Sequence, residues 1–376
     1  MTEAQGLFDR YATPAYPEEL TSPVLHKILG YERLQPHILG GKGVGSQGDG
    51  TAQFICPTST DQQTVIQILE RDLHLPALKL TITPQQKVCK AVIPAAGFGT
   101  RLFPATKATK KELFPVIGRD GIAKPAILIV IEEALEAGIE EVIIIVQKND
   151  LEEFQSLFNE QISIENYNKL PPQFKEYSRR LLEIGRRVTF VVQATQEGFG
   201  HAVFCAQKEV GDEPFLLMLG DHIYRSGIEP SCARQLLEAY QRHGQSIVGI
   251  RRTPEEQIGS FGTVTGVWLE DESLLSVSEF AEKPTPDYAR TNLRVPGLPE
   301  EEYLTLFGQY IIKPKLFDYL QEHIENNVRE HGEFQLTSAL DRLRQEDGFM
   351  GLVINGQCFD IGRPDEYLET LNAFRH

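Results

Sequence analysis

A glycine-rich loop followed by a cluster of cations constrains the fold of this chain more than any other feature. Both lie in residues 94–115, which read PAAGFGTRLFPATKATKKELFP and directly follow the short apolar stretch 88–93. This apolar stretch predicts a buried parallel strand that ends where the loop opens. Glycine in the loop allows positive φ and close backbone approach, so that amide N–H groups can point at oxygen anions. The pattern therefore predicts a phosphate-binding loop.

The charged side chains behind the loop strengthen this prediction. An ordinary strand-to-helix turn needs no such charges, whereas a bound phosphate is stabilised by cations placed beside backbone dipoles. The cations that follow the loop are Arg101, Lys107, Lys110 and Lys111.

Two commoner phosphate-binding motifs fit the chain poorly. A dinucleotide-binding fingerprint requires a third glycine three residues after Gly99, where Leu102 stands. A Walker loop requires Ser or Thr after its Gly-Lys pair, but Gly41-Lys42 is followed by Gly43. A dehydrogenase and a P-loop NTPase are therefore both disfavoured.

Charge and composition exclude further classes of protein. A net charge of -16 argues against a nucleic-acid partner or an anionic membrane surface, so phosphorylated substrates must be attracted by a local basic pocket. No apolar run approaches the ~18 residues of a membrane span and the N-terminus lacks a signal-peptide pattern, which favours a cytoplasmic protein. Five scattered cysteines, without paired or metal-type spacing, favour reduced thiols.

Apolar strands alternate with helical stretches beyond the N-terminal region, which predicts an α/β domain around a mainly parallel sheet. We expect a helix at 127–135 ended by Gly138, a helical insertion at 151–187 that caps one sheet edge, and strands at 142–146, 188–192, 215–219 and 246–250. Ligands of such sheets bind at the carboxyl ends of strands. The residues that follow each strand are therefore the candidate site residues.

The glycine loop and its cations carry a family resemblance. GxGTR followed by PATKAxxKE resembles the signature of bacterial nucleotidyltransferases that make sugar nucleotides, and is most similar to UTP–glucose-1-phosphate uridylyltransferases of the GalU type. The resemblance covers about residues 87–371. It implies a Rossmann-like mixed, mainly parallel sheet flanked by helices in a catalytic domain at 87–376. It also implies UTP and glucose 1-phosphate as substrates, Mg²⁺ as cofactor and a possible homo-oligomer.

The resemblance implies a nucleotide site made of the loop and of residues after the strand at 188–192. The amide of Gln193 suits the imide edge of uracil because it offers one acceptor and two donors, and Gly198 admits the flat base. Two departures from the family weaken the prediction of the base: Glu197 replaces a usual lysine, and Ala194 a usual glycine. The loop residues expected to bind the nucleotide are Ala95, Ala96, Gly97, Gly99 and Thr100.

Two aspartates resemble the metal pair of the family. Asp221 follows the strand predicted at 215–219, and Asp360 again ends an apolar stretch. Carboxylates at strand tips are ligands that Mg²⁺ prefers together with substrate phosphates. His222 is interpreted as a structural hydrogen-bonding residue.

A third group of residues is expected to bind the sugar phosphate. In the resembling family the glycine matching Gly262 and the glutamate matching Glu282 bind sugar hydroxyls, and the lysine matching Lys283 holds the phosphate. These roles suit the groups, since hydroxyls favour a charged acceptor and phosphate a compact cation. Glu333 matches a further sugar-contact glutamate, although Ser338 replaces the usual aspartate.

The implied reaction needs positive charge rather than a nucleophilic side chain. A sugar phosphate oxygen attacks the α-phosphorus in line, and the anionic transition state must be stabilised. Arg101 and the loop are expected to bind the triphosphate, and Lys111 the α-phosphate and the departing pyrophosphate. The alternatives are a thymidylyl or cytidylyl transferase acting on a related sugar 1-phosphate, and a noncatalytic sugar-nucleotide-binding regulator.

Residues 1–86 lie outside the resemblance and predict a small α+β extension. A glycine-rich segment at 39–54 is followed by a predicted helix at about 61–73 and a strand in which Leu78, Leu80 and Ile82 alternate. The segment is weakly similar to the C-terminal part of GHMP-type kinases but too short to be a kinase. A structural remnant, an oligomerisation element and a regulatory flap stay open, and we expect a noncatalytic role.

Overall fold

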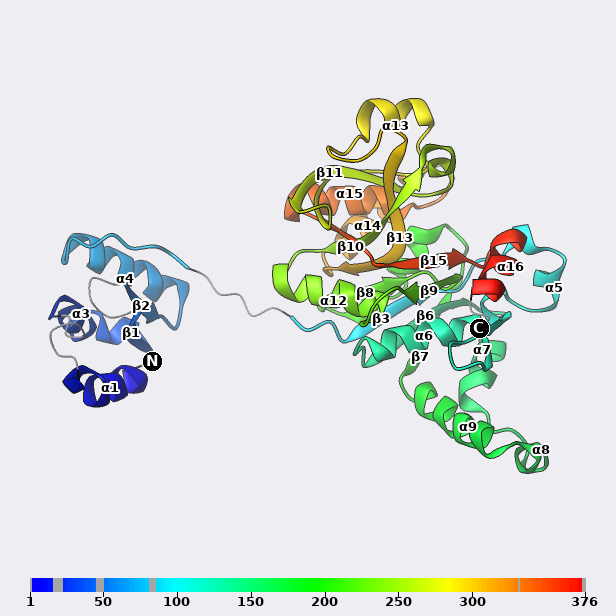
Figure 1. Cartoon of the computed structure of the whole chain (residues 1–376), viewed down its shortest axis with the longest axis horizontal. Coiled ribbons are helices and arrows are strands. Elements are labelled where there is room, and N and C mark those ends of the chain that lie inside the picture. Colours follow the sequence, from blue (N-terminus) through cyan, green and yellow to red (C-terminus); the bar gives the residue numbers. More distant parts are fainter. Residues whose placement is uncertain (1, 16–22, 45–50, 81–85, 331, 374–376) are drawn as a thin grey trace. The chain divides into compact units, whose positions relative to one another are not determined.

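The computed structural model describes residues 2–15, 23–44, 51–80, 86–330 and 332–373. The chain divides into two compact units, Met1–Pro84 and Gln85–His376, and each is described by itself (Figure 1). Within the described part, no helix is long and apolar enough to cross a membrane.

The first unit is a small α+β module around a two-stranded antiparallel sheet. Its core is formed by the buried side chains of Ile28, Leu34, Val65 and Ile68. The predicted helix at 61–73 is confirmed, and its first turn is capped by the side chain of Thr58. The elements are α1 (Thr2–Tyr11), η1 (Thr13–Ala15), α3 (Pro23–Leu29), η2 (Gln35–His37), β1 (Gly40–Val44), β2 (Thr51–Ile55) and α4 (Ser59–Arg71).

The prediction of a strand around Leu78 and Leu80 is wrong. Both residues have irregular backbone, and their exposed fractions are 98% and 67%. Alternation of apolar residues indicates a strand only where one face is buried, and here neither side chain is covered. Ile82 lies outside the described residues.

The second unit is built on a nine-stranded mixed sheet with the order β10-β14-β12-β11-β13-β8-β3-β6-β7. Strands β8, β3, β6 and β7 are parallel, whereas β13 pairs with β8 in the antiparallel direction. The mixed α/β fold is therefore confirmed, with its continuous parallel run confined to these four strands. The strands are β3 (Lys90–Pro94), β6 (Glu141–Gln147), β7 (Val188–Gln193), β8 (Phe215–Met218), β10 (Ile247–Pro254), β11 (Thr263–Glu270), β12 (Leu274–Ala281), β13 (Glu302–Ile312) and β14 (Met350–Val353).

Helices cover both faces of this sheet because its central strands are apolar on both sides. In β6, Ile144 packs into one core and Ile143 and Ile145 into the other. The first core includes α6 and α12, and the second includes α10, α14 and α15. The predicted helix at 127–135 is confirmed. These helices are α6 (Ala126–Glu136), α10 (Phe199–Phe204), α12 (Cys232–His243), α14 (Leu316–Glu325) and α15 (Leu336–Asp347).

The predicted insertion lies at the edge formed by β7. Phe158 of the insertion and Phe190 of β7 pack with their ring centroids 6.2 Å apart, while α8 extends away from the sheet (Figure 1). Pro171-Pro172 separates two helices, as the sequence predicts. The helices are α7 (Leu151–Asn159), α8 (Ile164–Lys169) and α9 (Pro172–Gly185).

A separate two-stranded ribbon joins distant parts of the chain. Strand β9 (His222–Ser226) pairs antiparallel with β15 (Gly356–Asp360), and His222 lies opposite Asp360. This register brings Asp221, which directly precedes β9, close to Asp360 at the end of β15. The remaining elements are η3 (Thr100–Leu102), α5 (Ala105–Ala108), η4 (Lys111–Leu113), β4 (Pro115–Ile117), β5 (Ala123–Pro125), α11 (Gln207–Val210), η5 (Glu255–Ser260), α13 (Pro286–Asn292) and α16 (Pro364–Ala373).

Candidate active site

The glycine loop opens at the carboxyl end of β3, as predicted. Gly99 has a φ of +75°, and a Cβ added there would lie 2.9 Å from Thr106 Cγ2, so this position requires glycine. Gly97 differs, because an added Cβ would meet nothing nearer than Lys111 Nζ at 3.9 Å. The backbone at Gly97 therefore faces the open side of the site, beside a lysine ammonium group.

Two glutamines that the sequence analysis did not single out hold the loop from behind. The side-chain amides of Gln147 and Gln196 both donate to the carbonyl of Ala96, with Gln196 at 2.7 Å. Gln147 ends β6 and Gln196 lies in the turn after β7. Their positions at or just after the ends of neighbouring parallel strands were the sequence signal that could have identified them as site residues.

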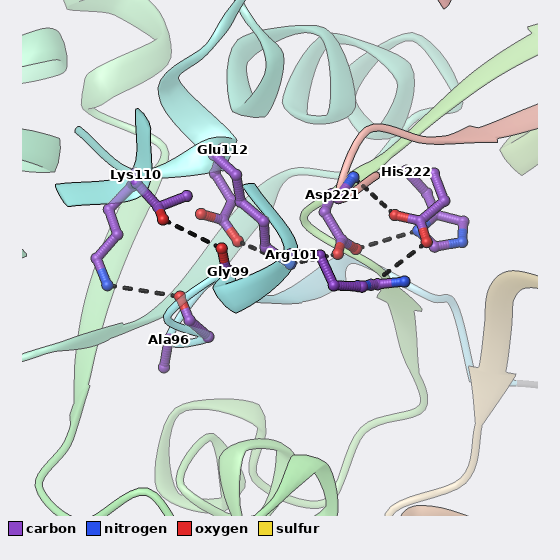
Figure 2. A network of polar contacts seen from close by, with 12 residues as sticks. Ala96, Gly99, Arg101, Lys110, Glu112, Asp221 and His222 are labelled. Carbon is purple, nitrogen blue, oxygen red and sulfur yellow. Dashed lines mark hydrogen bonds and ion pairs between the residues drawn. The ribbon is translucent and has the colours of Figure 1, made fainter. Parts of the chain in front are cut away.

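The lysines behind the loop have different partners. Lys110 is buried, pairs with Asp150 at 2.7 Å and lies 3.5 Å from the carbonyl of Gly97. Lys111 instead ion-pairs with Asp221, and Arg101 Nη2 lies 3.5 Å from Asp360 Oδ2. Figure 2 shows Arg101 close to Asp221 and His222, on the side away from Lys110. Lys110 therefore supports the loop, whereas Lys111 and Arg101 face the two aspartates.

Asp221, His222 and Asp360 form a cluster of possible metal ligands. One ligand atom from each lies within 4.8 Å of the others. His222 Nδ1 lies 3.1 Å from Asp221 Oδ1, and the amide of Gly362 donates to Asp360 Oδ1 at 2.8 Å. The cluster exists because the register of β9 and β15 sets His222 opposite Asp360.

Burial and neighbouring charges together set the protonation states of Asp221 and Lys111. Burial acts to raise the pKa of Asp221, but Lys111 and His222 together outweigh it and hold that pKa well below its usual range. Burial acts to lower the pKa of Lys111, but Asp221, with smaller contributions from Glu112 and Asp360, outweighs it, so the net pKa is raised. Both groups are therefore charged at neutral pH.

Glu112 was not predicted as a site residue, yet it is the most unusual carboxyl group here. Its exposed fraction is 2%, and its Oε2 has no hydrogen-bond partner within the described residues. Burial raises its pKa to about 8, although Lys111 acts to lower it. The apolar neighbours in Lys111-Glu112-Leu113-Phe114 were the only sequence signal of this burial.

The predicted base-binding residues lie together after β7. Gln193 is 4% exposed, and its Nε2 lies 3.0 Å from His201 Nδ1. Gly198 has a φ of +108°, and a Cβ there would lie 2.7 Å from Glu333 Cβ. Gly198 is thus required by packing as well as by backbone conformation, and Glu333 lies directly beside it.

Three of the four predicted sugar-binding residues, Gly262, Glu282 and Lys283, form another group, whereas Glu333 packs against Gly198. Glu282 accepts a hydrogen bond from Thr337 Oγ1 at 2.8 Å, and Lys283 Nζ lies 3.2 Å from Glu282 Oε1. A Cβ at Gly262 would lie 3.5 Å from Glu282 Oε2. Lys283 has a φ of +44°, which is unusual for a residue other than glycine. The sequence analysis did not identify Thr337, which orients Glu282.

The site combines a glycine loop at the end of a parallel strand, a lysine and an arginine that follow the loop, and paired aspartates at two strand tips. This combination defines a class of α/β enzyme that handles nucleoside phosphates. Residues 90–376 match the Nucleotidyl transferase family model, and the chain belongs to this family. Members of this family typically use a divalent metal ion. The family resemblance found in the sequence is confirmed.

Several relatives of the chain are named UTP–glucose-1-phosphate uridylyltransferase. A UTP–glucose-1-phosphate uridylyltransferase of Bacillus subtilis is 34% identical over 303 residues, which cover 77% of this chain and 91% of the relative. An apo UDP-glucose pyrophosphorylase structure is similar with a TM-score of 0.65 and 28% identity, over 76% of this chain and 98% of that one. A UDP-glucose pyrophosphorylase complexed with UDP-glucose has a TM-score of 0.62 and 29% identity, with the same coverage.

Proposed function

We propose that this protein is an enzyme that transfers the uridylyl group of UTP to glucose 1-phosphate, forming UDP-glucose and releasing pyrophosphate. The observation that carries the proposal is the position of Lys111, which lies beside Gly97 of the loop and pairs with Asp221. The name of relatives from Staphylococcus saprophyticus and Bacillus subtilis, UTP–glucose-1-phosphate uridylyltransferase, supports the choice of substrates.

In this proposal the loop backbone binds the triphosphate of UTP. The amide groups of Ala96, Gly97, Gly99 and Thr100 would face the phosphate oxygens. The amide of Ala95 was also predicted to bind the nucleotide, but it donates to the carbonyl of Ile145 at 2.8 Å, so Ala95 anchors the loop to the sheet instead. Arg101 adds charge at the exposed end, and Lys111 stabilises the α-phosphate and the departing pyrophosphate. Gln193 binds the imide edge of the uracil, and the turn at Gly198 lies against the base.

Asp221 and Asp360 would hold Mg²⁺. Their oxygens and the short spacing within the cluster fit a hard divalent cation that also binds substrate phosphates. When bound, the ion neutralises phosphate charge. His222 orients the carboxylate of Asp221 from beside it.

The sugar phosphate would bind through Gly262, Glu282, Lys283 and Glu333. Glu282 accepts from sugar hydroxyls while Thr337 fixes its other oxygen. Lys283 holds the phosphate whose oxygen attacks the α-phosphorus as the bond to pyrophosphate breaks. Holding two polyanions in line is the main task of the side chains, because they would otherwise repel each other.

The test is a substrate matrix. Pyrophosphate release is measured with Mg²⁺ for UTP, dTTP, CTP, ATP and GTP, each with several sugar 1-phosphates. We expect UTP with glucose 1-phosphate to give the highest kcat/KM. A preference for dTTP or CTP would favour the related transferases, and a purine preference would contradict the role of Gln193. Nucleotide binding without pyrophosphate release would instead favour a regulator.

Residues 1–86 are proposed to have a noncatalytic role, with the catalytic domain at 87–376. Removing residues 1–86 should leave the kinetic constants for UTP and glucose 1-phosphate unchanged. The assembly state of the shortened protein, measured by light scattering, tests the predicted homo-oligomer and the possible part of this segment in it. A loss of turnover would contradict the noncatalytic role. A cytoplasmic location stays a prediction.

A further inference from the structure

An ion pair joins the turn that carries Gly198 to the segment that carries Glu333. Arg329 Nη2 lies 2.6 Å from Glu197 Oε1, and the two side chains are only 29% and 33% exposed. The guanidinium of Arg329 also lies over the ring of Phe334, 3.9 Å from its centroid. Arg329 is thus held by a carboxylate and an aromatic face at once.

Backbone hydrogen bonds join the same two segments. The amide of Phe334 donates to the carbonyl of Glu197 at 2.8 Å, and the amide of Gly200 donates to the carbonyl of Phe334 at 2.9 Å. Gly198 fits against Glu333 with no room for a side chain. The described residues 332–335 are therefore attached to the base-side turn at several points.

The ion pair also connects to Gln193. Glu197 Oε2 lies 3.8 Å from His201 Nε2, and the other ring nitrogen of His201 lies 3.0 Å from Gln193 Nε2. A continuous path of polar contacts therefore runs from Gln193 through His201 and Glu197 to Arg329.

We propose that the Glu197–Arg329 pair positions Glu333 and couples the uracil side of the site to the sugar side. Glu197 and Arg329 are positioning residues, since they act through Gly198 and Glu333. This inference rests on the proposed function. A base bound against Gln193 and Gly198 fixes the turn that carries Glu197. The ion pair then restricts the movement of Arg329 and of the segment that carries Glu333. The coupling is reciprocal, so glucose 1-phosphate also strengthens binding of the nucleotide.

The experiment compares steady-state kinetics of Glu197→Gln, Arg329→Gln and both together. At saturating UTP we expect each variant to raise the KM for glucose 1-phosphate about two- to fivefold, with the change in KM rather than in kcat. The double variant should be no worse than either single one, because both changes break the same contact. The charge-reversed pair Glu197→Arg with Arg329→Glu should recover part of the loss.

Glu322→Gln is the matched control. Glu322 pairs with Arg342, which also lies over an aromatic ring, that of Tyr319 at 4.6 Å, on α14 and α15. This variant should leave the KM for glucose 1-phosphate unchanged. An equal rise of that KM in the control, or no rise in Glu197→Gln and Arg329→Gln, would overturn the inference.

Amide hydrogen exchange separates this inference from the proposed function. In Glu197→Gln the amides of Phe334 and Gly200 should exchange faster than in the wild-type protein, whatever the substrates are. If wild-type protein releases no pyrophosphate from UTP and glucose 1-phosphate, the proposed function fails and exchange alone decides the inference. Unchanged exchange at both amides would refute the positioning role even in an active enzyme.

Discussion

Lys111 and Asp221 form an ion pair at the meeting point of the glycine loop and the strand-tip aspartates, with side chains only 12% and 18% exposed. Each group keeps the other charged against the effect of burial. Such a partly buried pair is costly to break on one side only, because the remaining charge loses its partner. Catalysis and local stability are therefore linked at this contact.

Lys111→Ala and Asp221→Asn should each reduce kcat by about 10²- to 10³-fold, since the first removes the cation that stabilises the anionic phosphates and the second weakens the proposed binding of Mg²⁺. Pyrophosphate release under saturating substrates measures this. Lys169→Ala, which removes an exposed lysine on α8, should leave kcat unchanged. If both site variants stay active, the site is wrongly assigned.

Combining Lys111→Met with Asp221→Asn distinguishes lost chemistry from lost folding. The double variant leaves residue 221 uncharged when its partner is lost, so its free energy of unfolding should exceed that of Lys111→Met alone. Its turnover should stay as low as that of the single variants. Recovery of turnover together with stability would mean that the pair only supports the fold.

Gly97 and Gly99 should respond differently to alanine. Gly99→Ala places a Cβ at positive φ and 2.9 Å from Thr106 Cγ2, so we expect a loss of about 1–3 kcal/mol in the free energy of unfolding. Gly97→Ala has room and should keep wild-type stability, yet its methyl group would occupy the proposed phosphate position. Its affinity for UTP, measured by calorimetry, should therefore fall. Unchanged UTP affinity in Gly97→Ala would contradict the phosphate-binding role of the loop.

Local sequence patterns predicted much of this arrangement. Short windows of sequence show the glycine loop, the strands before and after it, and the positions of Asp221 and Asp360 after apolar stretches. They do not show the pairing of β9 with β15, because the two strands are far apart in the sequence and their register depends on the tertiary fold.

The pattern of charges alone could not distinguish between the adjacent lysines, and only the family resemblance assigned the α-phosphate to Lys111. Lys110 and Lys111 look equivalent in a cationic run, but backbone direction turns one toward Asp150 and the other toward Asp221. The extent of the parallel sheet was also overestimated, because an apolar stretch of sequence does not show the direction in which a neighbouring strand runs. Strands β11 and β12 form a hairpin, whose apolar residues resemble those of strands joined by helical crossovers.

The buried Glu112 should make stability depend on pH. Its pKa is raised to about 8 by burial, so between its unfolded pKa near 4.5 and 8 the folded state binds more protons than the unfolded state. The free energy of unfolding should therefore fall as pH rises through this window, by at most about a tenfold change in the unfolding constant per pH unit.

Glu112→Gln is the test, because glutamine keeps the shape and removes the titration. Urea unfolding at several pH values should show a smaller decrease of stability between pH 5 and 8 in the variant than in the wild-type protein. Glu165→Gln, at an exposed position on α8, should keep the wild-type dependence. Identical pH profiles for Glu112→Gln and wild type would show that Glu112 is ionised in the folded protein.

The backbone conformation of Lys283 should lower the free energy of unfolding, while its side chain supports binding of the sugar phosphate. Its φ of +44° costs about 1 kcal/mol or more in a residue with a Cβ, and glycine relieves this cost. We therefore expect Lys283→Gly to keep or raise the free energy of unfolding, while the KM for glucose 1-phosphate rises because the cation at the sugar phosphate is lost. Glu272 has a similar φ of +47°, and Glu272→Gly is the matched control that should leave this KM unchanged. A Lys283→Gly variant with wild-type KM would mean that the left-handed backbone there serves the turn alone.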